Sequence, residues 1–162
     1  MKRFWALALG LFLALGLSDP ARAEVIPYAK TLIAQTTIST ATTIISDVVS
    51  LGQSPETRAV AAQASFLYGS GGTATKVYVQ TSLDNGTTWA DVICLTFTTA
   101  AGNKVGAVNA SVAAPSPAPP TDGTLTDNTT LNGVLGDRLR VKVITTGTYA
   151  GATSIKVTLV QR

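Results

Sequence analysis

The sequence predicts an all-β protein, an antiparallel β-sandwich of about eight strands of the jelly-roll or Greek-key type. Three observations support this prediction. Thr, Ala, Val and Gly dominate the composition, runs of apolar, β-branched residues follow one another at short intervals, and turn-forming residues separate these runs. A length of 162 residues suits one domain with a proper core.

The first 23 residues form a segment of different character. Two basic residues precede an apolar stretch from Phe4 to Leu17, and an Ala-Arg-Ala sequence ends at Ala23. This layout is typical of a secretory signal peptide cleaved after Ala23, and the stretch is shorter than the roughly 20 residues that span a bilayer. The alternative is an apolar segment that stays on the chain, buried in an assembly or touching a membrane. Under either interpretation, residues 24–162 form the single β-sandwich domain.

The first three expected strands lie before the centre of the chain. Thr31–Ser39 and Thr42–Leu51 are rich in Thr, Ile and Val, and a Gly-Gln-Ser-Pro turn follows them. Arg58–Tyr68 contains several alanines and would suit a helix by propensity. We nevertheless expect a strand there, because its neighbours are strands and a glycine-rich turn follows it.

A hairpin in the middle of the chain is the strongest local prediction. Lys76–Ser82 alternates between apolar and polar residues, and Thr88–Thr98 is rich in apolar, β-branched and aromatic residues. Between them lies Asn85-Gly86, the residue pair favoured in type I′ turns because both central residues need a positive φ. The sequence therefore predicts that these two strands pair antiparallel.

The rest of the chain contains three further strands and one long connection. Lys104–Ser111 is a short expected strand. Val134–Ile144 alternates strictly, and a last strand with Ile155, Val157 and Leu159 inward follows a turn. The Pro-rich loop 113–122 cannot join a ladder and favours polyproline II, so we expect it to cross between sheets as a plain connection or as a docking arm.

One cluster of charges stands out. Arg138, Arg140 and Lys142 alternate with apolar residues and share one face of their strand. This basic stripe could contact a carboxylate-rich partner or phosphates, or it could be a solvated face that discourages edge pairing. Without residues 1–23, which hold three of the 12 basic and one of the nine acidic residues, the net charge falls from +3 to +1. We therefore expect no nucleic-acid partner.

The composition excludes most catalytic and metal-binding arrangements. The chain has no histidine and one cysteine, which removes Ser-His-Asp and Cys-His sites, most metal sites and any internal disulfide. Cys94 lies in an apolar run, so we expect a buried, inert thiol. Acid–base catalysis needs two carboxylates in one pocket, and no such pair stands out. We expect no enzyme, cofactor or metal from the candidate acids, Asp84, Asp91, Asp122, Asp127 and Asp137.

A short motif spans residues 82–89. Its sequence, Ser-Leu-Asp-Asn-Gly-Thr-Thr-Trp, matches Ser-x-Asp-x-Gly-x-Thr-Trp and resembles the Asp-box hairpin of sialidases and of many other secreted or viral β-proteins. The resemblance implies that the Asp and Ser side chains brace the turn and that the Trp packs under the hairpin, away from any catalytic site. One copy is present, where sialidase propellers carry several. The expected structural turn consists of Ser82, Asp84, Asn85, Gly86, Thr88 and Trp89.

A looser resemblance covers residues 75–162. Three segments, Val77–Val92, Leu131–Lys142 and Thr145–Gly151, are similar to small virion structural proteins of tailed bacteriophages. The resemblance implies a non-catalytic β-sandwich located in the virion, which decorates or cements the capsid or belongs to the head–tail apparatus. Its partners would be capsid or other virion proteins and further copies of itself, with a cyclic homo-oligomer, for example a trimer, as the default. The contact elements we expect are Phe4–Ile45, Pro115, Pro117, Pro119, Pro120, Arg138, Arg140 and Lys142.

Two other functions stay open. An exported bacterial surface module, cleaved after Ala23 and then secreted or held at the cell surface, would bind glycan or polymerise outside the cell. A hydrolase that uses the Asp-box region, which Asp84→Ala would test, is the remaining alternative.

Overall fold

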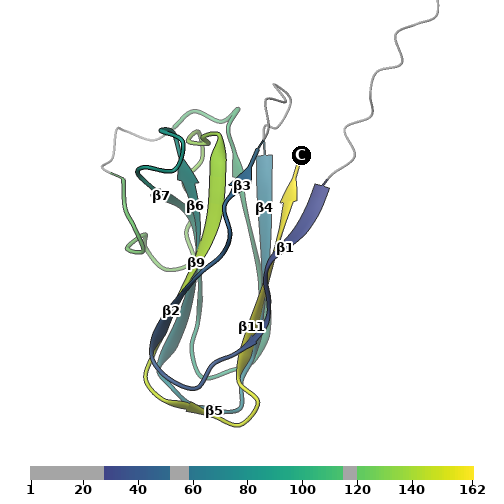
Figure 1. Cartoon of the computed structure of the whole chain (residues 1–162), viewed down its shortest axis with the longest axis vertical. Coiled ribbons are helices and arrows are strands. Elements are labelled where there is room, and N and C mark those ends of the chain that lie inside the picture. Colours follow the sequence, from purple (N-terminus) through teal and green to yellow (C-terminus); the bar gives the residue numbers. More distant parts are fainter. Residues whose placement is uncertain (1–27, 52–58, 115–119) are drawn as a thin grey trace, which may run out of the picture.

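The structure is a computed structural model, which describes residues 28–51, 59–114 and 120–162. These residues contain no helix and form two antiparallel sheets packed face to face (Figure 1). The prediction of an all-β sandwich is confirmed.

Each sheet contains four of the longer strands. Sheet A has the order β1-β11-β4-β8, formed by Tyr28–Thr37 (β1), Ser154–Gln161 (β11), Ala59–Leu67 (β4) and Gly102–Asn109 (β8). Sheet B has the order β2-β9-β6-β7, formed by Thr42–Ile45 (β2), Arg138–Thr146 (β9), Ala74–Ser82 (β6) and Ala90–Phe97 (β7). Three two-residue strands complete the set: Val49–Ser50 (β3) beside β9, and the pair Ser70–Gly71 (β5) and Tyr149–Ala150 (β10).

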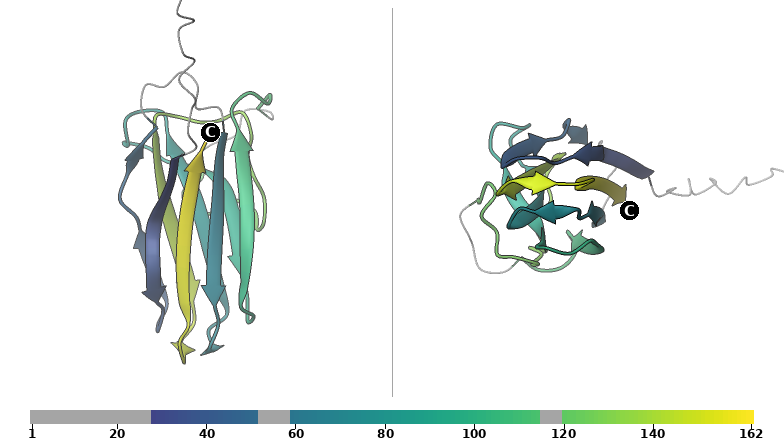
Figure 2. Two further views of the ribbon diagram at one scale, coloured as in Figure 1. Left: turned by 90° about the vertical axis from the view of Figure 1, so that its right-hand side faces the viewer. Right: turned by 90° about the horizontal axis from the view of Figure 1, so that it is seen from below.

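The chain passes from one sheet to the other between most successive long strands. The exception is the connection from β6 to β7, which are neighbours in sheet B and form the predicted hairpin. Strands distant in sequence therefore become neighbours, as β1 and β11 do at one side of sheet A. Figure 2 shows sheet A face on, with β1 and β8 at its two opposite edges.

The core lies between the sheets and follows the period-two pattern of the sequence. In β9, Leu139, Val141 and Val143 are fully buried, whereas the three basic residues point to the outer face, as predicted. In β4 the buried residues are Val60, Ala62, Ala64 and Phe66. This alternation confirms a strand rather than a helix in the alanine-rich segment, because a helix would bury residues three and four apart.

Two predicted strands are shorter than expected. The predicted strand Thr42–Leu51 is interrupted between β2 and β3. There the Ser46 hydroxyl, instead of a backbone carbonyl, accepts a hydrogen bond from the Val141 N–H at 2.9 Å. The strand predicted from Val134 begins only at Arg138. The cause lies at Gly136, whose N–H donates to Thr81 Oγ1 at 2.7 Å and whose backbone packs directly on Ser82.

Several predictions fall outside the described residues. These are the signal-peptide-like segment 1–23, the part of Phe4–Ile45 before Tyr28, and Pro115, Pro117 and Pro119. Pro120 is described and exposed. In the described ranges, no helix is long and apolar enough to cross a membrane.

Gly136 provides a test of the packing between β9 and the hairpin. A Cβ at this position would lie 1.8 Å from the Ser82 carbonyl oxygen, so the backbone must shift. We predict that Gly136→Ala lowers the free energy of unfolding by about 3 kcal/mol, measured by denaturant titration. Gly102→Ala is the matched control, because a Cβ at Gly102 meets nothing within 4 Å. Equal stability of the two variants would contradict this packing.

Candidate functional site

The outer face of sheet B is covered over β6 and β7 by residues 121–131, which we call the covering segment. The segment bonds to the edge of β7: the N–H of Asp91 donates to the Thr121 carbonyl at 2.8 Å, and the N–H of Cys94 donates to the Thr129 carbonyl at 2.9 Å. A part of the connection between β8 and β9 therefore closes the edge that β7 would otherwise present to solvent.

The covering segment buries side chains that point away from the core. Tyr78 and Gln80 in β6, and Asp91, Cys94 and Thr96 in β7, are all at most 7% exposed. The prediction that Cys94 is a buried thiol is confirmed. Burial raises the pKa of Tyr78 above its usual value.

The Asp91 carboxylate is the centre of this arrangement. It accepts the backbone N–H groups of Gly123 at 2.8 Å, Thr124 at 3.0 Å and Leu125 at 3.2 Å, and the Gln80 amide at 2.7 Å. Asp91 is fully buried. We call this arrangement the Asp91 cage. Such a buried carboxylate is stable only because donors surround it, so its role in the structure is to hold the covering segment in place.

A β-bulge in the hairpin places Asp91 in the cage. Val79 pairs with Ile93, but the next residue, Gln80, pairs with Asp91 instead of Val92. In a regular ladder Asp91 would lie opposite Thr81 and point into the core. The extra residue turns the carboxylate to the outer face, which is a frequent use of bulges.

The Gln80 amide joins two carboxylates. Its nitrogen also donates to Asp122 at 2.7 Å, and its oxygen accepts the Arg140 Nε–H at 2.7 Å. Hydrogen bonds from Gln80 and from Lys142 to the Asp122 carboxylate lower the pKa of Asp122. Asp91 and Asp122, which the sequence did not single out as a pair, therefore meet at Gln80.

This pair of acids is arranged as a brace. The hydrogen bonds that the described residues give the two carboxylates all come from donors: backbone N–H groups, the Gln80 amide, or the cations Arg140 and Lys142. Asp91 is also sealed beneath the covering segment. Sequence reasoning missed the pair because the register of the hairpin, which the bulge sets, had to be known first.

The basic stripe is engaged within the chain. Arg138 donates to Asn85 Oδ1 at 2.6 and 2.8 Å, and Lys142 Nζ lies 2.9 Å from Asp122 Oδ1. The side chains of Arg140 and Lys142 are 15% and 14% exposed, so this stripe is not a freely solvated face. Contact between these cations and a partner protein stays a prediction.

The predicted turn residues form a braced loop at the end of the hairpin. Ser82 Oγ donates to Asp84 Oδ1 and accepts the Gly86 N–H, both at 2.8 Å, and the Thr88 N–H and hydroxyl each donate to Asp84 at 2.7 Å. Asn85 and Gly86 have φ values of 57° and 94°, the positive values expected of a type I′ turn. Hydrogen bonds to the carboxylate, above all from Thr88, lower the pKa of Asp84 to about 2.

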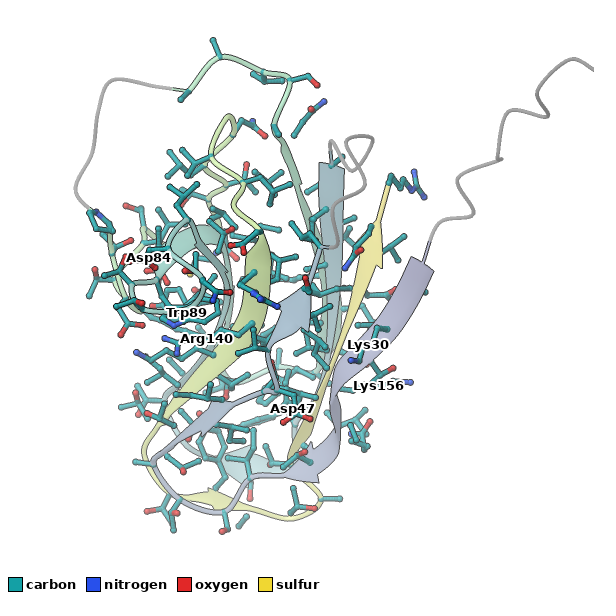
Figure 3. The ribbon with its side chains drawn as sticks, turned by 45° about the horizontal axis from the view of Figure 1, so that its top comes forward. Lys30, Asp47, Asp84, Trp89, Arg140 and Lys156 are labelled. Atoms are coloured by element: carbon teal, nitrogen blue, oxygen red, sulfur yellow. The ribbon has the colours of Figure 1, made fainter. Side chains whose placement is uncertain are left out.

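Trp89 connects this loop to the polar network of sheet B. Its ring is half-buried, with the Arg140 guanidinium carbon 4.2 Å from the ring centroid. Figure 3 shows Asp84, Trp89 and Arg140 together at one side of the molecule, away from Lys30 and Lys156. The Trp ring therefore packs against a cation of β9, and such a stack contributes about 0.5–2 kcal/mol.

Two shallow, open grooves lie between β7 and β8. One, of about 290 Å³, is lined by residues that include Lys104, Gly106 and Thr130, and the other, of about 350 Å³, shares Lys104 with it. In the described part of the chain, no group of three or more His, Cys, Asp or Glu side chains could hold a metal ion. Comparisons with protein families, with curated proteins and with solved structures find no match for this chain.

The Asp91 cage leads to a prediction about the covering segment. Asp91→Asn replaces one acceptor oxygen of the carboxylate with an amide NH2 group. This group can only donate, so N–H donors of the cage would lose their acceptor. We expect the free energy of unfolding to fall by about 3 kcal/mol. The covering segment should also loosen, so that the Cys94 thiol, the one thiol of the chain, reacts faster with a thiol reagent under native conditions.

Asp47→Asn is the matched control for this experiment. Asp47 is exposed, and it accepts the Ser46 hydroxyl through its backbone carbonyl, which the substitution leaves in place, so stability and thiol reactivity should both stay at the wild-type values. Slow Cys94 labelling in Asp91→Asn, equal to that of the control, would contradict the role of the cage.

The pKa of Asp84 gives a pH-dependent prediction. The folded-state pKa of about 2 lies below the ordinary value of 3.8, so ionised Asp84 stabilises the fold above about pH 4. This contribution is lost as the pH falls from about 4 to 2. We predict that the difference in unfolding free energy between wild type and Asp84→Asn is constant above about pH 5 and shrinks below pH 4. A difference that stays the same down to pH 2 would contradict the brace.

Proposed function

We propose that this protein is a non-enzymatic structural component of a phage virion. It would decorate or stabilise the capsid or the head–tail assembly through contacts of its β-sandwich with capsid proteins, other virion proteins or further copies of itself. The observation that carries the proposal lies on the outer face of sheet A, where two adjacent rows of residues across β11, β4 and β8 contain no charge and consist mostly of small side chains.

The register of the strands defines this face. Thr158, Gln63 and Val105 lie in one row across β11, β4 and β8, and Val160, Ala61 and Ala107 form the next row. Neither row contains a charged residue, and the nearest charges along β11 are Lys156 on one side and, directly after the strand, Arg162 on the other. Depletion of charge is typical of the cores of protein interfaces, whereas a surface that meets only water usually mixes both signs of charge.

The strand order also supports a structural role. Numbered along the chain, the eight strands of four or more residues occupy sheet A in the order first, eighth, third, sixth, and sheet B in the order second, seventh, fourth, fifth. We assign this order to the jelly-roll class, which is frequent in viral capsid proteins and in lectins. The strand order supports the proposal by analogy with other proteins of this fold. The uncharged rows on the outer face of sheet A favour an assembly role among the functions that this fold serves.

The polar side chains favour assembly over catalysis. Asp91, Asp122 and Asp84 are each occupied by hydrogen-bond donors that hold loops in place. The basic stripe is likewise used within the chain, which supports the absence of nucleic acid among the proposed partners.

The second candidate is an exported surface module that binds glycan or polymerises outside the cell. The signal-peptide pattern of residues 1–23 favours it, and jelly-roll lectins provide a precedent for glycan binding. This candidate places the mature chain outside the cell, with a new N-terminus at Glu24.

Mass spectrometry of purified phage particles tests the proposal. Particles from a lysate of the strain that carries the gene should contain the chain in a fixed ratio to the major capsid protein, and a high-salt wash should not remove it. A chain found only in the culture medium, beginning at Glu24, would contradict the virion role and support the exported module. Glycosidase turnover that disappears in a folded Asp84→Ala variant would instead support a hydrolase.

A further inference from the structure

We propose that β8 is a self-pairing edge: β8 of one chain pairs antiparallel with β8 of a second copy across a two-fold axis at Val105. The two copies of sheet A then merge into one continuous sheet. This inference goes beyond the proposed function, because it concerns the isolated chain and holds whether or not the protein belongs to a particle.

The backbone shows which groups of β8 face outward. Ala59, which pairs with Asn109, exchanges both of its backbone hydrogen bonds with Arg162 at 2.9 Å, so its groups point away from β8. Asn109 is therefore at a non-hydrogen-bonded position and directs its own groups out of the sheet. Because this direction alternates along a strand, Asn103, Val105 and Ala107 also direct their N–H and C=O groups out of the sheet.

These outward groups are available over a short, symmetric stretch. At one end, Asn109 is already occupied, since its N–H donates to Asn132 Oδ1 at 2.9 Å and its carbonyl accepts the Gly133 N–H at 3.0 Å. At the other end the strand begins at Gly102. Between these limits, the described residues provide no hydrogen-bond partner for the outward groups of Asn103, Val105 and Ala107. The free stretch is therefore centred on Val105.

A two-fold axis at Val105 makes this edge complementary to itself. Val105 would face Val105 of the second copy, and Asn103 would face Ala107 of the second copy. Such a ladder contains about six backbone hydrogen bonds and places no charge opposite a like charge. A two-fold axis also makes the paired strands antiparallel and closes the assembly at two copies.

β8 has no exposed charge, no proline and no bulge that would prevent it from pairing with another strand. Exposed edges are commonly protected by charged side chains, prolines or bulges. The one charge of β8, Lys104, points inward and donates its ammonium to the Thr96 carbonyl at 2.5 Å and to Asn128 Oδ1 at 2.8 Å. Val105, in contrast, is apolar and 69% exposed.

The space beside β8 suits an added strand. The groove of about 290 Å³ runs along Lys104, Val105 and Gly106, with Thr129 and its neighbours on the opposite side. In the proposed register Lys104 of the second copy lies opposite Gly106. Gly106 has no side chain, so nothing on this strand opposes that lysine, whose ammonium keeps its hydrogen bonds to Thr96 and Asn128 of its own chain.

The other edge of sheet A is less suited to pairing. The register between β1 and β11 shifts twice, between Thr31 and Ile33 and again between Ile33 and Thr36. Such irregularities bend and twist an edge strand and disturb a ladder. β8 pairs with β4 without any shift, and Figure 2 shows it as the straight outer strand at its edge of the sheet.

Proline at position 105 tests the proposal with little effect on the fold. The Val105 N–H points out of the sheet, so Val105→Pro removes no hydrogen bond within the chain, and edge strands tolerate proline at such positions. In sedimentation equilibrium we expect dimers for wild type and for the control Val105→Thr, which keeps the N–H. Val105→Pro should weaken the dimer at least about tenfold while circular dichroism stays unchanged.

Amide hydrogen exchange gives a second measurement that does not rely on a variant. In the dimer, the amides of Asn103, Val105 and Ala107 should exchange slowly, and dilution to the monomer should make them fast. Outward amides of a solitary edge strand would exchange fast at every concentration.

Three outcomes would overturn the proposal. The first is a wild-type chain that stays monomeric with fast exchange at Val105, and the second is a dimer that Val105→Pro leaves intact. The third is a mass that grows with concentration beyond that of two copies, which open-ended pairing of β8 with β1 would give. All are measured on the purified chain, so they are independent of whether the protein is found in phage particles.

Discussion

The buried carboxylate of Asp91 is the interaction on which the arrangement of this molecule depends. Three successive backbone N–H groups and the Gln80 amide surround it, and together they hold the covering segment flat on sheet B. Without such donors an ionised group could not stay in a site with no exposure to water. The same bonds that make the charge tolerable therefore fix the path of the long connection between β8 and β9.

The hairpin loop and the Asp91 cage are parts of one network. Arg140 packs on Trp89 at the end of the hairpin and donates to Gln80, whose amide reaches both Asp91 and Asp122. Polar side chains from β6, β7, β9 and the covering segment are thus used to stiffen sheet B and its loops. In such a network each group depends on its neighbours, because an unpaired buried member is costly.

This use of side chains leaves the two sheets with different surfaces. Sheet B is covered by its own chain over β6 and β7, whereas sheet A presents two uncharged rows of mostly small residues and ends at β8, where the outward backbone groups of Asn103, Val105 and Ala107 have no partner among the described residues. The proposed assembly role and the proposed pairing of β8 both rest on this difference. A protein that acts by presenting a rigid sheet needs one face fixed internally and another left open.

The sequence by itself determined the all-β class, the approximate positions of the longer strands, the alternation of Leu139, Val141 and Val143, and the burial of Cys94. These features depend on local periodicity and turn chemistry, which neighbouring residues encode. Only the tertiary structure decided that Asp91 and Asp122 meet and that the basic stripe is engaged internally. The reason is the bulge after Val79: it changes the register by one residue, turns Asp91 to the outer face, and joins it to backbone groups more than 30 residues away.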